Sequence, residues 1–148
     1  APRVGGLVAP DSSPAALRGA RTRLVGAGNV AFRTLDISRD AIGETYDVIV
    51  ASEVLYLVPG GWRGMRRALG RLADGLEPGG HLVMAHAHLF ADDPSAPGYT
   101  WPGVVGAETV ARVAAPLPGL PLEAARRVRR HRVHAAVQCP SVPSDARH

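Results

Sequence analysis

The chain contains no lysine, a single cysteine and no long apolar segment. Cys139 has no partner for an internal disulfide, and the first residues lack the charged-then-apolar order of a secretory signal, so the expected location is the cytoplasm. No apolar run approaches the roughly 18 residues that cross a bilayer, so no membrane span is predicted. Arginine supplies every basic charge behind the net charge of +4. With abundant Ala, Gly and Pro, this bias is typical of a GC-rich coding sequence, and no nucleic-acid partner is predicted from charge alone.

The length and composition predict one globular domain. The chain has 148 residues, of which 46% are apolar and 20% charged, as is usual for a soluble protein with one core. Residues 1–138 are predicted to form this domain, and residues 139–148 a disordered tail.

Four apolar segments are predicted to be strands, at residues 4–9, 30–35, 46–51 and 81–88. The run from Val48 to Ala51 is uninterrupted, which is typical of a parallel strand covered on both faces. A helix is expected after the first of these strands, with Ser13 as its N-cap and Pro14 in its first turn, whereas a polar link joins the second strand to the third. The strand–helix–strand order predicts an α/β fold with a mostly parallel sheet.

Further along the chain, the spacing of apolar residues predicts a helix that begins at Trp62 and continues to about Leu76. The segment 77–80, Glu-Pro-Gly-Gly, is expected to break it before the next strand. A third helix is predicted over residues 107–115, and residues 122–128 and 130–137 are predicted to pair as a closing antiparallel hairpin.

Acidic or hydroxyl side chains follow three of the predicted strands, at Asp11, Asp36 and the Ser52-Glu53 pair. In open α/β sheets, ligands bind beyond the carboxyl ends of the strands. A carboxylate accepts hydrogen bonds from ribose hydroxyls or an adenine amine, so the recurrence suits a nucleoside-containing cofactor. Alternatively, Asp11 is an Asx-turn or capping residue and Asp36 a solvated loop acid.

The order of these segments resembles a known family. GLVAPDSSPAALRGARTRL, NVAFRTLDIS, YDVIVASEVLYLV and LADGLEPGGHLVMAHAHL together resemble the class I methyltransferases that use S-adenosylmethionine. Within that class they are most similar to the small-molecule N-methyltransferases of the nodulation protein S type. The segments GYTWPGVVGAETVARV and RHRVHAAVQ are similar to the same subgroup, and the resemblance extends from Val4 to Gln138.

The resemblance implies specific roles for residues of this chain. Asp11, with Ser12 beside it, matches the acid that holds the cofactor's ribose, while Asp36 and Ile37 match the pair that contacts adenine. Ser52 and Glu53 match the motif beside the methionine portion and the acceptor. The implied reaction is methyl transfer to a small-molecule acceptor, with an amine as the candidate nucleophile. Glu53 and His86 are the candidate bases, and the predicted acceptor pocket comprises Tyr56, His88, Tyr99 and Trp101. Alternatively, His86 is a strand residue hydrogen-bonded in the core, and Tyr99 and Trp101 only anchor their loop.

The chain departs from the family at its beginning. No GxGxG occurs anywhere in it, although the family has a strand followed by such a loop before the segment that matches Val4. That strand is central in the family's sheet, so the chain is predicted to be a truncated Rossmann-like domain with a gap between its first and third strand segments, residues 4–9 and 46–51. The chain is then a fragment of a longer protein, or another element fills the gap, or the domain binds the cofactor poorly.

Three other functions are a metal site, a nicotinamide-dependent oxidoreductase and a non-catalytic module. His86 and His88 have the spacing of a metal pair on one strand face, but no third ligand is near, so no metal site is predicted. A nicotinamide-dependent oxidoreductase would need a Gly-rich turn and a Tyr-Lys proton donor, and lysine is absent. The alternative that stays open is a non-catalytic interaction or regulatory module that keeps the methyltransferase fold.

Overall fold

The computed structural model describes residues 4–87, 105–128 and 132–138. The chain divides into two compact units, Ala1–Asp40 and Ala41–His148, which we call unit 1 and unit 2. The predicted tail and the segment with His88, Tyr99 and Trp101 lie outside the described residues.

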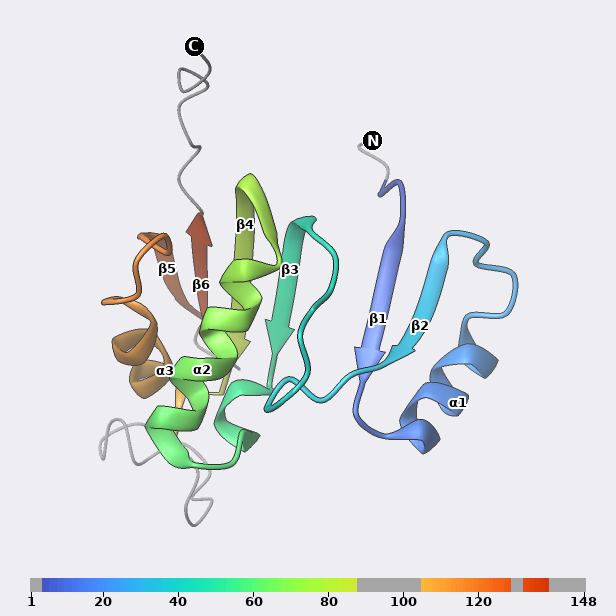
Figure 1. Cartoon of the computed structure of the whole chain (residues 1–148), viewed down its shortest axis with the longest axis horizontal. Helices are drawn as coiled ribbons and strands as arrows, with labels where there is room; N and C mark the ends of the chain where they lie inside the picture. The colour runs from blue at the N-terminus through green and yellow to red at the C-terminus, as the bar shows by residue number, and fades with distance from the viewer. Residues whose placement is uncertain (1–3, 88–104, 129–131, 139–148) are drawn as a thin grey trace. The chain divides into compact units, whose positions relative to one another are not determined.

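Unit 1 contains two parallel strands and one helix. Strand β1 (Leu7–Asp11) pairs with β2 (Val30–Thr34), and α1 (Pro14–Arg23) connects them (Figure 1). The predicted cap is confirmed, because the Ala16 backbone N–H donates to Ser13 Oγ over 3.3 Å and Pro14 begins the helix. Leu17 is the buried residue of α1.

Unit 2 is built on a sheet with the strand order β3-β4-β6-β5. Strand β3 (Tyr46–Ser52) is parallel to β4 (Leu76–His86), and the antiparallel hairpin of β5 (Leu122–Val128) and β6 (Arg132–Gln138) completes the sheet through β6. Between the strands lie η1 (Leu55–Leu57), α2 (Gly61–Asp74) and α3 (Ala107–Ala114). The α/β class, the parallel pairs and the closing hairpin are therefore confirmed.

Helix α2 packs on one face of this sheet and supplies much of the core of unit 2 (Figure 1). Its inward side chains recur three and four residues apart, as an amphipathic helix requires. Leu82 and Met84 of β4, together with Val110 of α3, are also buried. Trp62, the first apolar residue of the predicted helical spacing, does not join this buried face, because its side chain is 56% exposed. The buried residues of α2 are Gly64, Met65, Ala68, Leu69 and Leu72.

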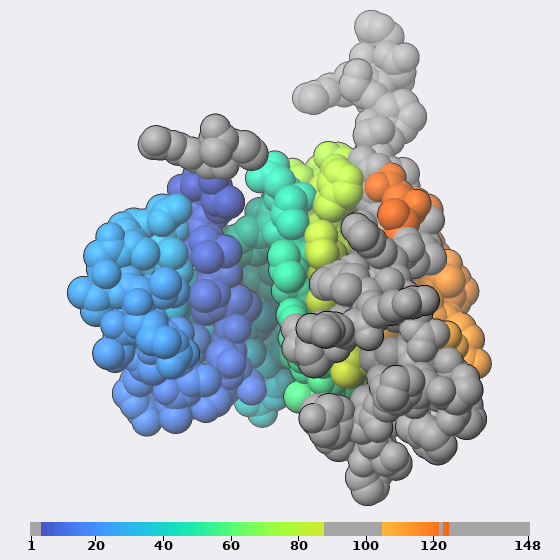
Figure 2. Space-filling model, turned by 180° about the vertical axis from the view of Figure 1, so that it is seen from behind, coloured from blue at the N-terminus to red at the C-terminus, as the bar shows by residue number. Residues whose placement is uncertain are grey.

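The prediction that Val48–Ala51 is covered on both faces is also wrong. Ala51 is buried, but Val48 and Val50 are 54% and 65% exposed. Side chains alternate between the faces of a strand, and the two valines therefore share the face opposite Ala51. Figure 2 shows strands β3 and β4 at the molecular surface when the molecule is seen from behind. The continuous apolar run thus predicted the strand correctly, but only one of the two faces of the strand is buried.

Strand β4 begins earlier than predicted. The segment 77–80, predicted as a helix-to-strand break, lies within β4, because Tyr46 pairs with Leu76 before the register shifts between Tyr46 and Val48. Glycine permits this irregularity at two positions. Gly79 has φ +83°, and a Cβ on Gly80 would lie 3.0 Å from the carbonyl oxygen of Tyr46.

The expected gap in the strand order is present among the described strands. β1 and β2 form one sheet, and β3 begins a second sheet of four strands, with no ladder linking β1 to β3. In the family's order, the central strand would stand between these two. The prediction of a truncated Rossmann-like sheet is therefore confirmed for the described part of the chain.

Gly64 of α2 offers a test of this packing. A Cβ at Gly64 would lie 1.9 Å from the carbonyl oxygen of Pro59, so Gly64→Ala forces the backbone apart. We expect it to lower the free energy of unfolding by about 1–3 kcal/mol, measured by urea denaturation. The matched control is Gly70→Ala in the same helix, where a Cβ meets nothing within 4 Å. The control should raise stability by up to about 1 kcal/mol because alanine has the higher helix propensity. Equal effects of the two changes would contradict the close contact.

Candidate functional site

Glu53 has an unusual backbone conformation at the end of β3. Its φ is +55°, and no other non-glycine residue in the described ranges has a positive φ. A left-handed conformation costs a side-chain-bearing residue on the order of 1–3 kcal/mol, and such strain is concentrated at functional sites. The backbone N–H of Glu53 donates to the carbonyl oxygen of Ala85 over 2.8 Å. The β3–β4 pairing thus extends past the last strand residue and holds the turn.

The side chain of Glu53 is fixed as well. Its Oε2 accepts hydrogen bonds from the hydroxyl of Tyr56 and, over 3.3 Å, from the backbone N–H of Ala87. Tyr56 reaches back because η1 turns the chain directly after β3. Ala87 directly follows β4, so the carboxylate connects the carboxyl ends of two neighbouring parallel strands. This is the edge of an α/β sheet at which ligands are expected.

His86 lies beside this carboxylate and is 2% exposed. Its ring meets that of Tyr56 edge to face, with centroids 5.6 Å apart and an interplanar angle of 69°. Neither ring nitrogen has a hydrogen-bond partner among the described residues. Burial lowers the pKa of His86 to about 4, although the charge of Glu53 acts in the opposite direction. The imidazole is therefore neutral near pH 7, buried as a core histidine would be, but without a hydrogen bond to a described neighbour.

In unit 1, Asp11 forms the turn that the sequence left open as an alternative. Its Oδ1 accepts the backbone N–H of Ser13 over 2.7 Å, which is an Asx turn leading into α1. Its backbone carbonyl accepts the N–H of Leu35 over 3.2 Å. Both Asp11 and the adjacent Ser12 are exposed. The turn holds the carboxyl group directly after β1 and occupies only part of its capacity to accept hydrogen bonds.

Asp36 is more constrained than a solvated loop acid. Its Oδ1 accepts the N–H of Ser38 over 2.9 Å, and its Oδ2 lies 3.2 Å from Nε of Arg39. Its own N–H donates to Oδ2 of Asp40 over 2.8 Å. Asp36 and the following Ile37 are half-buried, so this loop after β2 has a defined shape.

The structure therefore assembles part of the predicted site within unit 2, where Glu53, Tyr56 and His86 contact one another. Ser52 ends β3, is exposed, and pairs with Ala85. Asp11 and Asp36 follow neighbouring strands of unit 1. His88, Tyr99 and Trp101 are outside the residues that the structure describes.

Two features of this site were missed from the sequence. The left-handed conformation of Glu53 has no signal in the residue type, because glutamate rarely adopts it. The Ala87 N–H is a backbone donor, which residue identity does not reveal. The Glu53–Tyr56 contact, by contrast, could have been predicted from the sequence, since residues three apart meet when the chain turns after a strand.

No group of three metal-binding side chains occurs within residues 4–87, 105–128 and 132–138. In the same ranges, every helix is too short or too polar to cross a membrane.

Comparison with known proteins identifies the family. Residues 4–82 match the family model described as "Methyltransferase domain", which is more than half of the chain. The chain therefore belongs to the methyltransferase domain family, as the resemblance of its segments predicted.

The relatives refine this result. Nodulation protein S of Rhizobium tropici is 36% identical over 110 residues, which are 74% of this chain and 43% of that protein. Methyltransferase calH of Penicillium decumbens is 33% identical over 93 residues, 60% of this chain and 22% of that protein. This chain thus spans less than half the length of either curated relative.

A solved structure is also similar. N-methyltransferase NodS from Bradyrhizobium japonicum WM9, crystallised with S-adenosyl-L-homocysteine, superposes with a TM-score of 0.75 at 26% identity. The match covers 92% of this chain and 67% of that one. The predicted similarity to the nodulation protein S type is confirmed.

The burial of neutral His86 predicts a pH dependence of stability. The unfolded chain binds a proton at a pKa near 6.5 and the folded chain only near 4, so folding loses stability as the pH falls through this window. The loss attributable to His86 is about 3 kcal/mol. His86→Gln should reduce the change in unfolding free energy between pH 7 and pH 4, measured by urea denaturation.

The matched control for this experiment is His81→Gln in the same strand. The His81 side chain is 42% exposed and lies 3.7 Å from Glu123, so this control should retain the steep loss of stability on acidification. A pH profile of His86→Gln as steep as that of the unmodified chain would contradict a buried neutral imidazole.

Proposed function

We propose that this domain transfers a methyl group from S-adenosylmethionine to the nitrogen of a small-molecule amine. Membership of the methyltransferase domain family and similarity to an N-methyltransferase crystallised with S-adenosyl-L-homocysteine support the proposal. The observation that carries it is the fixed Glu53 carboxylate beside neutral, buried His86 at the carboxyl ends of β3 and β4.

The acids of unit 1 fit the polar groups of the proposed cofactor. Asp11 would accept hydrogen bonds from the ribose hydroxyls, with Ser12 beside it. Asp36 would accept from the adenine amine in addition to its bonds with Ser38 and Arg39, and Ile37 would contribute its backbone amide. Carboxylates accept hydrogen bonds, and the ribose hydroxyls and the adenine amine donate them, so the acids of unit 1 are chemically matched to the cofactor.

S-adenosylmethionine supplies a methyl group on a sulfonium, which is already activated for transfer, so the protein mainly has to position the acceptor and exclude water. The two hydrogen bonds from Tyr56 and Ala87 fix the carboxylate of Glu53, with Ser52 adjacent. The fixed carboxylate would attract a cationic amine and hold that amine in one place. An amine must lose its proton before its lone pair can attack. Glu53 and His86 are the proposed acceptors of that proton. Because the pKa of His86 is only about 4, with the charge of Glu53 already acting to raise it, the carboxylate that holds the ammonium is proposed as the first acceptor and neutral His86 as a weaker base beside it.

The acceptor pocket is proposed to include Tyr56, whose hydroxyl keeps Glu53 in place. His88, Tyr99 and Trp101 are proposed to complete its wall. Aromatic rings of this kind suit a cationic amine because their faces carry partial negative charge.

A second function remains open, since the described strands form two sheets without a connecting strand. A non-catalytic interaction or regulatory module would keep the family fold and lose cofactor binding. The methyltransferase proposal differs from it in requiring that the acids of unit 1 bind the cofactor.

Calorimetry with S-adenosyl-L-homocysteine tests the cofactor proposal on two proteins, residues 1–148 and a form extended upstream of Ala1. We expect binding by the extended form, and a loss of at least about tenfold in affinity for Asp11→Asn because a hydrogen bond to a charged acceptor is removed. Asp47→Asn is the matched control, as Asp47 is an exposed acid on β3.

The outcomes of this titration are distinct. Binding by the extended form alone means that residues upstream of Ala1 are required, whereas no binding by either form contradicts the methyltransferase proposal and favours the non-catalytic module. Equal losses for Asp11→Asn and Asp47→Asn would remove the assigned role of Asp11.

The role of Glu53 is tested with Glu53→Gln, which has the same shape and can still accept from Tyr56. With a small primary amine as acceptor and the cofactor saturating, we expect methyl transfer to slow by about tenfold to a hundredfold at neutral pH, since the charge that holds the ammonium is lost. The defect should shrink at high pH, where the amine is already deprotonated. A defect independent of pH would indicate a structural role instead, and Asp47→Asn should retain full activity.

A further inference from the structure

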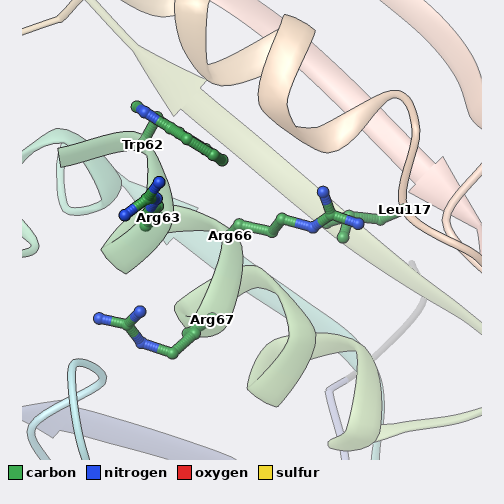
Figure 3. Close-up of a pocket in the computed structure, with 5 residues that line it drawn as sticks. All are labelled: Trp62, Arg63, Arg66, Arg67 and Leu117. Atoms are coloured by element: carbon green, nitrogen blue, oxygen red, sulfur yellow. The ribbon is translucent and has the colours of Figure 1, made fainter. Parts of the chain in front are cut away.

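A surface cavity of about 380 Å3 lies on α2, lined by Trp62, Arg63, Arg66, Arg67 and Leu117 (Figure 3). We call it the arginine cavity. Its volume is at the lower end of the range of small-molecule sites, about 300–1,000 Å3. None of its lining residues belongs to the Glu53 site.

The arginine cavity has a strong positive charge. Three arginines within two turns of one helix line it, and their side chains point in different directions, with Arg67 directed away from Trp62 and Leu117 (Figure 3). Helix α2 has no acidic side chain in its first turn. In the described part of the chain, none of these three arginines has a carboxylate partner within 4 Å. Like charges three and four residues apart on a helix repel one another, and cations near a helix N-terminus are unfavourable. A bound anion would relieve both effects.

The side chains are also arranged for contact with more than a simple ion. Figure 3 shows Arg66 extending toward Leu117, and Arg63 lying beside Trp62. The guanidinium carbon of Arg63 is 5.2 Å from the ring centroid of Trp62, so stacking limits its freedom. Trp62 is 56% exposed, although its residue type favours burial. An indole and a leucine thus form an apolar wall next to three cations.

We propose that the arginine cavity binds a small organic phosphate, a phosphate monoester carried on an apolar or aromatic group. The planar fork of arginine matches two phosphate oxygens at once. The positive charges of the three arginines attract a doubly charged phosphate more strongly than a singly charged carboxylate. Trp62 and Leu117 contact the apolar group. This inference does not depend on methyl transfer and involves neither cofactor nor acceptor.

Calorimetry with phenyl phosphate as the probe tests the proposal at low salt and a pH above 7, where the phosphate is a dianion. The unmodified chain should bind phenyl phosphate more tightly than inorganic phosphate, which lacks the apolar group, and more tightly than benzoate, which has one charge. Added salt should weaken binding. Undetectable binding of phenyl phosphate would overturn the proposal, and tighter binding of benzoate would overturn the assignment to phosphate.

Paired variants locate the site. Arg63→Gln with Arg66→Gln should lower the affinity for phenyl phosphate at least about tenfold, whereas Arg18→Gln with Arg23→Gln, which removes the same charge from α1, should change it less than twofold. Equal losses in the two double variants would show nonspecific attraction and reject the arginine cavity as the site.

A third variant separates the apolar contact from the charge. Trp62→Leu should weaken phenyl phosphate several-fold and leave inorganic phosphate unchanged, so the ratio of the two affinities should fall. An unchanged ratio would reject the apolar wall. Because Trp62 and the arginines are exposed, these variants should fold, and a thermal melt by circular dichroism checks this for each protein titrated.

Discussion

The parallel pairing of β3 with β4 is the interaction on which the candidate site depends. It places the carbonyl of Ala85 where it receives the N–H of Glu53, and the N–H of Ala87 where it meets the Glu53 carboxylate. Both bonds come from the same backbone segment, and they fix the backbone and the side chain of Glu53. They hold Glu53 at φ +55°, a conformation that would be unfavourable in an isolated turn. The same register buries His86, so the carboxylate and the neutral imidazole result from one constraint.

One-sided packing explains both the core and the surface of unit 2. Helix α2 and the buried residues of β4 enclose Ala51, while Val48 and Val50 on the alternate positions of β3 stay exposed. The sequence of β3 has the composition of a strand with two covered faces. The family's strand order has a further strand between β1 and β3, which is absent among the described residues.

Much of the fold was predictable because each element has a local cause. Ser13 and Pro14 begin α1, and apolar residues at helical spacing define α2. The antiparallel hairpin follows from two short runs at the C-terminal end. Predictions failed where a distant contact determined the result. Strand β4 starts at Leu76 because Tyr46 pairs there, and Gly80 permits the close approach. No local pattern contains that information.

The site was predictable in its residue types but not in its geometry. The acids after the strands marked Asp11, Asp36 and Glu53, since ligands bind at the carboxyl ends of parallel strands. The bonds of Asp11 and Asp36 within their own loops leave each carboxyl group able to accept further hydrogen bonds, so they are compatible with the proposed cofactor contacts. An Asx turn uses one oxygen and orients the other, so the same hydrogen bond that shapes the loop prepares the carboxylate.

Two regions of unit 2 contradict local preferences, and neither was found by its pattern. Glu53 occupies a backbone region that suits glycine, and α2 begins with arginines and an exposed tryptophan where acids and buried apolar residues are favoured. Sequence reasoning uses average preferences, so it interprets such residues as ordinary strand ends or helix faces. Proteins violate local rules mainly where function compensates for the cost. The violation at Glu53 has visible compensating bonds within the chain. At α2, Arg63 stacks on Trp62, but none of the three arginines has a carboxylate within 4 Å among the described residues, which is the reason to seek further compensation in a bound anion.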